Sequence, residues 1–148
     1  MVQGAHWGQI TFYGQAIKKN VRRVQILQNQ LLKVLGKNEF KYSTDTLHSD
    51  YDLLKVNDIT KQETLTFVHK YHTNCLPPVF DNYFVSFSHN YNTRFGSQSY
   101  IIDNHSTCAA ALSVKIVGVK LWNQLDNDLK LIPTRKKFRN KLKEFLLS

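Results

Sequence analysis

Two groups of side chains in this sequence have types and spacings that could support chemistry, and the first is a pair of carboxylates. Asp50 and Asp52 lie two residues apart in the segment Ser-Asp-Tyr-Asp at 49–52. Clustered carboxylates are what a metal-dependent polymerase or nuclease needs to hold Mg²⁺. Two residues apart on a helix, however, the side chains point in different directions. We therefore interpret the pair as a solvated helix end and expect no catalytic residue there.

The second group could bind a metal. His69, His72 and Cys75 follow one another at three-residue spacing, and Cys108 or His105 could supply a fourth ligand. Nitrogen and sulfur ligands of this kind suit zinc. No Cys-x-x-Cys pair accompanies them, and the fourth ligand would come from about thirty residues away, so helix residues beside a core cysteine are the favoured interpretation. No nucleophile motif and no Gly-rich phosphate loop occurs, and we expect no metal and no cofactor.

Apolar residues at three- and four-residue spacing predict the helices that position these groups. The first should pack through Ile17, Val21, Val24, Gln28, Leu31, Leu32 and Leu35, and should end at Gly36. A short helix capped by Ser43-Thr44-Asp45 should run to about Leu54, and a third, capped by Asn57, should run over 58–74 until Pro77-Pro78 forbids continuation.

The second half of the chain begins with a possible helical turn at 79–84 and a long loop over 85–103, with a strand at 99–102. Residues 109–112 and 114–119 fit helix or strand, and 119–131 fits a short helix around Trp122. After Thr134, a final helix should pack through Phe138, Leu142, Phe145 and Leu146.

The fold class that follows is mostly α: a small helical domain with a long irregular central segment and at most a short β-hairpin. We expect residues 1–38 to form an extended or strand-like lead-in and a basic helix. Residues 39–148 should form a helical domain with a central loop at about 85–112.

The net charge of +9 is concentrated at the two ends of the sequence. Residues 1–38 hold six basic residues and no acid, and residues 133–148 hold six basic residues and one acid. Residues 39–132 hold eight basic and ten acidic residues. Such ends suit a polyanionic partner, and solvated faces of ordinary helices are the alternative.

Composition excludes several classes of protein. With 42% hydrophobic and 21% charged residues, a chain of 148 residues can bury a core and is not disordered throughout. No run approaches eighteen apolar residues and the first ten lack a secretory pattern, so we expect no membrane partner. Only two cysteines occur, which favours a reducing compartment, cytosol or nucleus.

Eight segments, in order, resemble the region that follows the reverse transcriptase domain of jockey-like and related non-LTR retrotransposons. Tyr13-Gly14 stands where that family has Trp-Gly, and the segment 26–35 is similar to its Leu-Gln-Lys-x-x-Ile-Arg-Ile-Ile helix, with Lys33 in place of the Arg. Gly118 to Leu125 matches Gly-Pro-x-Leu-Trp-Asn-x-Leu-Pro, with Val119 and Asp126 in place of the prolines. The remaining matches are 54–59, 67–72, the Leu-Pro-x-x-Phe break at 76–80, His-x-Tyr-x-Thr-Arg at 89–94, and the closing helix at 138–147.

The resemblance covers residue 12 to the end and implies a C-terminal fragment of an RNA-directed DNA polymerase. The parent would carry an aromatic-x-Asp-Asp turn, which this sequence lacks, so we expect the fragment alone to be no enzyme and the catalytic palm to lie upstream. The first helix would continue the polymerase thumb. Expected partners are RNA or DNA and the upstream polymerase domain.

Basic residues at the two ends should contact the nucleic-acid backbone, and loop aromatics (Tyr83, Phe84, Phe87, Tyr91, Phe95, Tyr100) could stack on bases or pack internally. The alternative function is a protein–protein interaction module with solvated basic helices and no nucleic-acid role. The candidate nucleic-acid-binding residues are Lys18, Lys19, Arg22, Arg23, Lys33, Arg94, Arg135, Lys136, Lys137, Arg139, Lys141 and Lys143.

Overall fold

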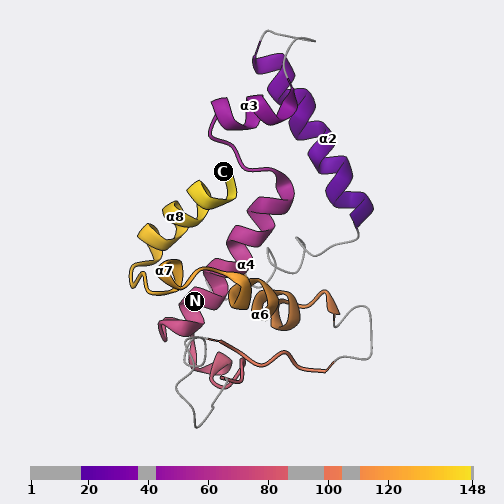
Figure 1. The fold of residues 1–148 in the computed structure, drawn as a ribbon. Coiled ribbons are helices and arrows are strands. Elements are labelled where there is room, and N and C mark those ends of the chain that lie inside the picture. Colours follow the sequence, from indigo (N-terminus) through magenta and orange to yellow (C-terminus); the bar gives the residue numbers. More distant parts are fainter. Residues whose placement is uncertain (1–17, 37–42, 87–98, 105–110, 148) are drawn as a thin grey trace. The chain divides into compact units, whose positions relative to one another are not determined.

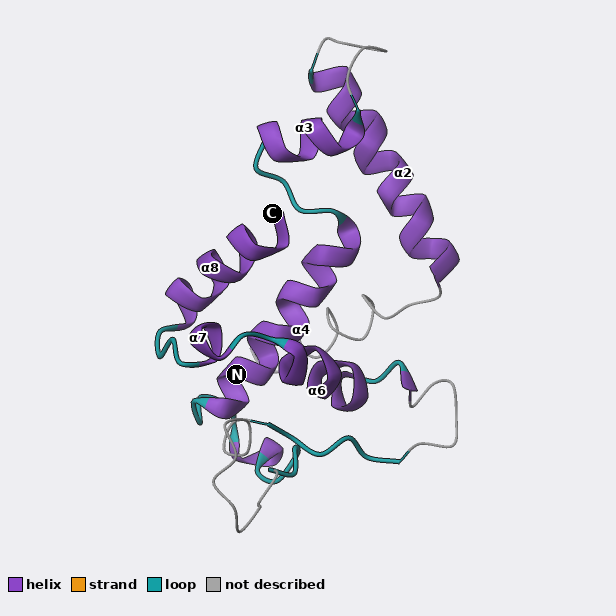
Figure 2. Cartoon of the chain, in the orientation of Figure 1, coloured by secondary structure: helices purple, strands orange, loops and turns teal. Residues whose placement is uncertain are grey.

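A computed structural model describes residues 18–36, 43–86, 99–104 and 111–147 (Figure 1). In these ranges 69% of the residues are helical and no strand occurs (Figure 2), so the prediction of a mostly α fold is confirmed. An isolated antiparallel bridge joins Ser86 to Tyr100. The elements are α2 (Lys18–Leu35), α3 (Thr44–Asp50), α4 (Val56–His72), the 3-10 turn η1 (Pro78–Phe80), α6 (Val114–Gln124), α7 (Asn127–Lys130) and α8 (Arg135–Leu147).

The chain divides into two compact units, residues 1–60 with 143–148 and residues 61–142. Helices α4 and α8 each contribute residues to both units. The domain boundary expected near residue 38 stays a prediction.

In the first unit, α2 ends as predicted, with the Gly36 amide donating to the Leu32 carbonyl at 2.9 Å. Ser43 caps α3 as predicted, because its hydroxyl accepts from the Asp45 amide at 3.3 Å. α3 ends at Asp50, earlier than expected, since Asp52 adopts a left-handed φ of 51° that ends the helical path.

The predicted inner face of α2 is wrong in three positions. Val24, Leu31 and Leu35 are 51%, 59% and 59% exposed, whereas Leu32 is buried. Gln28 and Leu32 pack as predicted, and the amides Gln25 and Asn29 join them: the three amide side chains are half-buried and form hydrogen bonds to the segments that follow. The buried face is therefore displaced from the predicted one toward residues whose polar groups find partners.

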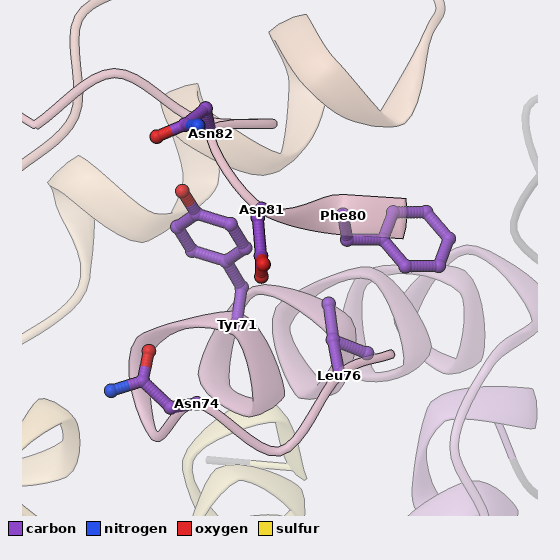
Figure 3. Close-up of a pocket in the computed structure, with 6 residues that line it drawn as sticks. All are labelled: Tyr71, Asn74, Leu76, Phe80, Asp81 and Asn82. Atoms are coloured by element: carbon purple, nitrogen blue, oxygen red, sulfur yellow. The ribbon is translucent and has the colours of Figure 1, made fainter. Parts of the chain in front are cut away.

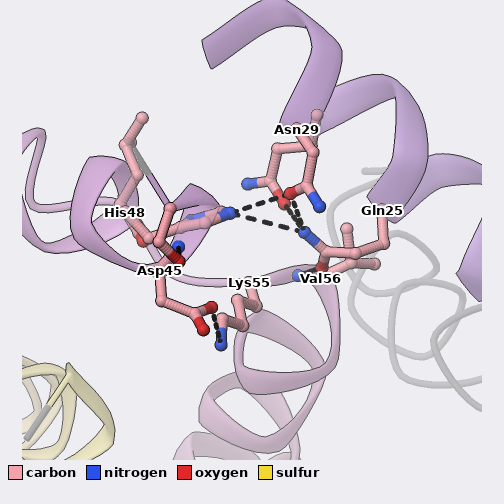
Figure 4. Close-up of polar contacts among 9 residues, drawn as sticks. Gln25, Asn29, Asp45, His48, Lys55 and Val56 are labelled. Carbon is pink, nitrogen blue, oxygen red and sulfur yellow. Dashed lines mark hydrogen bonds and ion pairs between the residues drawn. The ribbon is translucent and has the colours of Figure 1, made fainter. Parts of the chain in front are cut away.

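The start of α4 is also held differently from the prediction. The helix begins at Val56, so Asn57 lies inside its first turn and does not cap it. The Val56 amide, which has no partner within the helix, donates to Gln25 Oε1 of α2 at 2.8 Å (Figure 4). Lys55 supplies the first carbonyl, which accepts from the Asp58 and Ile59 amides.

The second unit has a core built from α4, α6 and α8. Trp122 and Phe138 are fully buried, together with Val68, Val119 and Leu142. The His69 ring stacks on Phe138 with 4.1 Å between ring centroids and 15° between planes. The prediction that Trp122 belongs to the core is confirmed, whereas Phe145, expected on the same buried stripe as Phe138, is 51% exposed.

α6 approaches α4 closely at Gly118. A Cβ atom there would lie 3.0 Å from Val68 Cγ2 and 3.4 Å from Thr64 Cγ2, so a larger residue could not fit without movement. The segment 114–119, which fitted helix or strand, is helical and belongs to α6. The single helix predicted over 119–131 is divided into two helices, because Leu125 and Asp126 are extended (ψ 144° and 142°) between α6 and α7.

Candidate nucleic-acid interface

Among the described residues, the candidate cations with the most exposed side chains lie on α8, which is amphipathic. Phe138 and Leu142, one turn apart, are completely buried and fix the orientation of the helix. The other side carries cations: Lys136, Lys137 and Lys141 are exposed, and Arg135 is half-buried. Because the apolar stripe is anchored, the cationic face points away from the core.

Two cations of α8 are already opposed by carboxylates. Arg139 Nη2 lies 2.6 Å from Glu63 Oε1, and Lys143 Nζ lies 2.5 Å from Asp52 Oδ2. A phosphate at either position would compete with the carboxylate. Direct contacts by Arg139 and Lys143 therefore stay predictions, and we expect the main contacts from Lys136 and Lys137, which are exposed.

α2 contributes the other candidate residues of the described chain. Arg22 and Arg23 are exposed and Lys33 is half-buried. Lys18 and Lys19 fall in the first turn of the helix, and their side chains lie outside the described residues, as does the whole of Arg94. The structure therefore tests no contact of these three residues.

The first turns of both basic helices are electrostatically unusual. The first turns of α2 and α8 hold no acidic residue, and each contains two or more cations, Lys18-Lys19 in α2 and Arg135-Lys136-Lys137 in α8. The N-terminus of a helix is its positive end, so cations there are unfavourable by about 0.3–1 kcal/mol each. An anion bound at these turns would relieve that repulsion, and the first amides of a helix have no acceptor within the helix itself.

Three lysines of the second unit have pKa values shifted by their surroundings. The pKa of Lys70 is lowered, first by burial and then by repulsion from Arg135. Lys130 is buried, and burial lowers its pKa, while Asp126 opposes the shift. Lys115 is different: Asp103, 2.5 Å away, raises its pKa, so Lys115 stays a cation whose charge the carboxylate opposes. Lys120, which is exposed on α6, is not among the candidates predicted from the sequence, because it lies in the charge-balanced middle of the sequence.

The histidines and cysteine of the metal hypothesis have other partners. His69 Nε2 lies 2.6 Å from the Ile132 carbonyl and His72 Nδ1 lies 3.0 Å from the Tyr100 hydroxyl. Burial lowers the pKa of both rings. Cys75 is exposed, and its thiol donates to the Thr73 carbonyl. In the described part of the chain no three such residues gather into a possible metal site, and Cys108 and His105 lie outside it.

The loop aromatics that the structure describes pack internally. Phe84 and Tyr100 are 3% and 5% exposed, and Tyr83 is half-buried in edge contacts with Phe67 and Phe84. Base stacking by Phe84 and Tyr100 is therefore excluded in this fold, and the packing alternative is confirmed. Phe87, Tyr91 and Phe95 lie outside the described residues.

Sequence analysis missed the polar residues that hold this segment. Asn123 Nδ2 donates to the Tyr100 carbonyl at 2.8 Å while Asn123 Oδ1 accepts from the Tyr100 amide at 3.0 Å. The Tyr71 hydroxyl donates to the Phe84 carbonyl at 2.9 Å. The only signal in the sequence was the Trp-Asn pair at 122–123, which names no partner for the amide.

A pocket of about 420 Å³ opens beside η1 (Figure 3). Its lining holds one carboxylate, two side-chain amides and no cation, and Asn74 and Asn82 adopt left-handed φ values of 53° and 63°. A carboxylate without a cation repels phosphate, so we expect no phosphate contact in this pocket. The lining residues are Tyr71, Asn74, Leu76, Phe80, Asp81 and Asn82.

No protein-family model, curated protein or solved structure matches this chain. Among the described helices, none combines the length and apolar character required to cross a bilayer.

Proposed function

We propose that this chain binds RNA or DNA through the phosphate backbone, as the C-terminal part of a non-LTR retrotransposon reverse transcriptase without its catalytic palm. The observation that carries the proposal is the charge of the two basic helices: α2 and α8 both begin with cations at the end where the helix dipole disfavours them. In a chain that binds no anion, acidic residues in those first turns would stabilise the helices better than cations do.

The geometry of α8 suits backbone contacts. Lys136 and Lys137 are exposed in its first turn, and Lys141 follows one turn after Lys137. Phosphates of one strand recur at intervals of several ångströms, and a row of exposed lysines can neutralise several of them without reading bases. Since Phe84 and Tyr100 are buried in the aromatic cluster, the proposed binding depends on charge rather than on their stacking.

The parent activity, copying RNA into DNA, is proposed from the ordered motifs of the sequence. In that role this chain holds the template–primer duplex or the element RNA. Carboxylates elsewhere in the parent protein catalyse the polymerase reaction. Gly118 and Trp122, both buried, and Asn123, hydrogen-bonded to Tyr100, show that the Gly-x-x-Leu-Trp-Asn segment packs and positions other residues.

The test is equilibrium binding of the full chain to labelled duplex RNA, RNA–DNA hybrid and single strands over a range of salt. With about six phosphate contacts, log affinity should fall against log salt with a slope of about −4 to −5, whatever the base sequence. Lys136→Gln with Lys137→Gln should weaken binding to every sequence and flatten the slope by about 1.4–1.8.

A matched control removes the same charge where carboxylates already oppose it. Lys55 lies 2.7 Å from Asp45 and Lys115 lies 2.5 Å from Asp103. Lys55→Gln with Lys115→Gln should leave affinity and slope nearly unchanged. Equal losses from the two double variants, or binding without salt dependence, would contradict the proposal.

A further inference from the structure

His48 of α3 is a buried histidine whose two ring nitrogens both face oxygen atoms. The residue belongs to the first unit and is 3% exposed. Nδ1 lies 2.9 Å from the Leu53 carbonyl oxygen, and Nε2 lies 3.1 Å from Asn29 Oδ1 of α2 (Figure 4). A carbonyl oxygen only accepts, so each contact needs a proton on the ring nitrogen, and a neutral imidazole carries just one. The protonation state of His48 therefore depends on which end of its amide Asn29 presents.

The orientation of Asn29 follows from hydrogen bonds that begin at the backbone. The Val56 amide only donates, so the Gln25 atom 2.8 Å from it is Oε1, and Gln25 Nε2 points the other way. The Leu54 carbonyl only accepts, so Gln28 presents Nε2 to it at 2.8 Å and Oε1 to Gln25. Gln25 Nε2 donates its two hydrogens to Gln28 Oε1 at 3.0 Å and to Asn29 Oδ1 at 2.8 Å. A reversed Asn29 amide would place a donor against this donor, so Asn29 presents its oxygen.

Gln25 is also unable to donate to His48. Its Nε2 lies 3.4 Å from His48 Nε2, but both of its hydrogens are directed at Gln28 and Asn29. His48 Nε2 therefore donates to Asn29 Oδ1, and Nδ1 donates to the Leu53 carbonyl. Only the doubly protonated, positively charged ring makes both of these hydrogen bonds.

The charges around His48 act in both directions. A buried cation costs stability unless its N–H groups have acceptors, and here both have one. Asp45, one turn earlier on α3, also favours the charge: its pKa is lowered mainly by Lys55, 2.7 Å away, and further by His48. α2 contains no acidic residue, and Arg22 and Lys33, which lie on its Asn29 side, oppose the charge. The first turn of α4 adds one carboxylate, Asp58.

We propose that His48 is a proton-dependent connection between α2, α3 and the start of α4, complete only while its ring is charged. Loss of the second proton would leave a nitrogen lone pair facing the oxygen of Leu53 or of Asn29. If Asn29 turned its amide to relieve this contact, Gln25 would lose an acceptor, and Gln25 in turn holds the Val56 amide. The loss of one proton would therefore loosen the contacts of α2 with both segments that follow it. This inference does not depend on nucleic-acid binding.

The sign of the pH dependence follows from the two hydrogen bonds. They bind the second proton in the folded chain and are absent from the unfolded chain, so the contribution of His48 to stability is complete at low pH. It is lost as the pH rises and the folded chain gives up this proton. A histidine that is buried in its neutral form, such as His69, has the opposite effect and acts below about pH 6.5.

Nuclear magnetic resonance of the full chain with isotopically labelled histidine counts the protons on the His48 ring. A series from about pH 5 to about pH 9 extends beyond the range in which unperturbed histidines titrate. We expect bonded protons on both ring nitrogens, and we expect the folded chain to lose the second proton at a higher pH than the urea-unfolded chain does. If the folded chain loses it at the same pH or at a lower one, the proposal is overturned.

Asn29→Asp and Asn20→Asp form a matched pair of variants. Asn29→Asp places a carboxylate oxygen beside Nε2 and should raise the pH at which His48 loses its proton by about one unit or more. Asn20 is exposed on the opposite side of α2, so Asn20→Asp adds the same charge away from the ring and should shift that pH little. Equal shifts in the two variants would show that Nε2 does not donate to residue 29, and would overturn the proposal.

His48→Gln tests the consequence for stability, because an amide has no proton to lose. Between about pH 6.5 and about pH 8.5, the free energy of unfolding of the unaltered chain should fall, and that of His48→Gln should fall less. His72→Gln, which removes a half-buried ring of the second unit, should keep the fall of the unaltered chain. The same pH dependence in the unaltered chain and in His48→Gln would contradict the proposed connection.

Discussion

Asn123 pairs with the main chain of Tyr100 through both ends of its amide, accepting from the Tyr100 amide and donating to the Tyr100 carbonyl. The Asn123 side chain thus makes the pair of main-chain hydrogen bonds that a neighbouring β-strand would otherwise make to Tyr100. The pairing fastens residues 99–102 to α6 next to Trp122, and the bridge from Ser86 to Tyr100 extends it to the preceding segment.

Asn123→Ala should destabilise the chain by about 1–3 kcal/mol, because it leaves two backbone groups of a buried residue without partners. The measurement is urea unfolding, together with hydrogen exchange of the Tyr100 amide, which should accelerate. Gln124→Ala, at an exposed neighbouring position, should change neither. Unaltered exchange at Tyr100 in Asn123→Ala would show that the pairing contributes nothing.

Gln25→Ala should loosen the start of α4. The Val56 amide would lose its acceptor, and Asn29 and Gln28 would lose the amide donor that contacts both of them. We expect a loss of about 1–3 kcal/mol and faster hydrogen exchange at Val56. Gln30→Ala, on the exposed side of the same helix, is the control and should have little effect. Equal melting temperatures for the two variants would contradict the capping role.

Trp122→Ala should unfold or severely weaken the second unit, at a cost of about 3–5 kcal/mol. Trp122 is fully buried and contacts the rings of His69, His72 and Phe138. Thermal melting measures the loss. Leu131→Ala, which truncates a residue that is 64% exposed, should leave the melting temperature almost unchanged. Similar losses in both variants would be incompatible with a core centred on Trp122.

Stability should fall as the pH drops below about 6.5, in part because of His69. Burial lowers the pKa of His69 in the folded chain, so the unfolded chain takes up the proton first. The contribution of His69 is therefore complete above the unfolded pKa and is lost as the pH falls through the folded pKa. His69→Gln cannot titrate, yet its amide can still donate to the Ile132 carbonyl. Free energies of unfolding between pH 7 and 5 should slope more steeply in the unaltered chain, and identical slopes would refute the role of His69.

The chain alone should not extend a primer. It has no aromatic-x-Asp-Asp turn, and in the described residues no three carboxylates, histidines or cysteines gather to hold Mg²⁺. Primer extension on an RNA template with Mg²⁺ or Mn²⁺ is the measurement, with an intact reverse transcriptase as the positive control. Nucleotide incorporation by the pure chain would overturn the interpretation.

Local patterns predicted most of the helices. The Ser43 cap and the end of α2 at Gly36 depend on residues close in sequence, and each occurs where expected. The third helix does not continue through Pro77-Pro78, but it ends earlier than predicted, at His72, because Asn74 adopts a left-handed φ of 53°. Trp122 was also predictable as core, because it stands in an apolar segment.

The features that were predicted wrongly share a physical cause: each depends on contacts with residues far away in the sequence. Asn57 has the right chemistry for a helix cap, but Gln25, thirty-one residues before Val56, occupies the cap position in space. Periodicity detected the stripe of Val24 and Leu31 without showing whether anything covers it. The exposure of Lys136 and the engagement of Arg139 by Glu63 are likewise tertiary facts, and residue type alone treated the two cations as equivalent.

Gly118 also constrains how this sequence can change over evolutionary time. Its missing Cβ leaves room for Val68 Cγ2, so an alanine at 118 requires Val68 to give way by a few tenths of an ångström. Among relatives with this fold, we therefore expect alanine or serine at 118 to accompany a smaller residue at 68. Such a compensating pair of inherited substitutions would be independent evidence that α4 and α6 are in contact at this position.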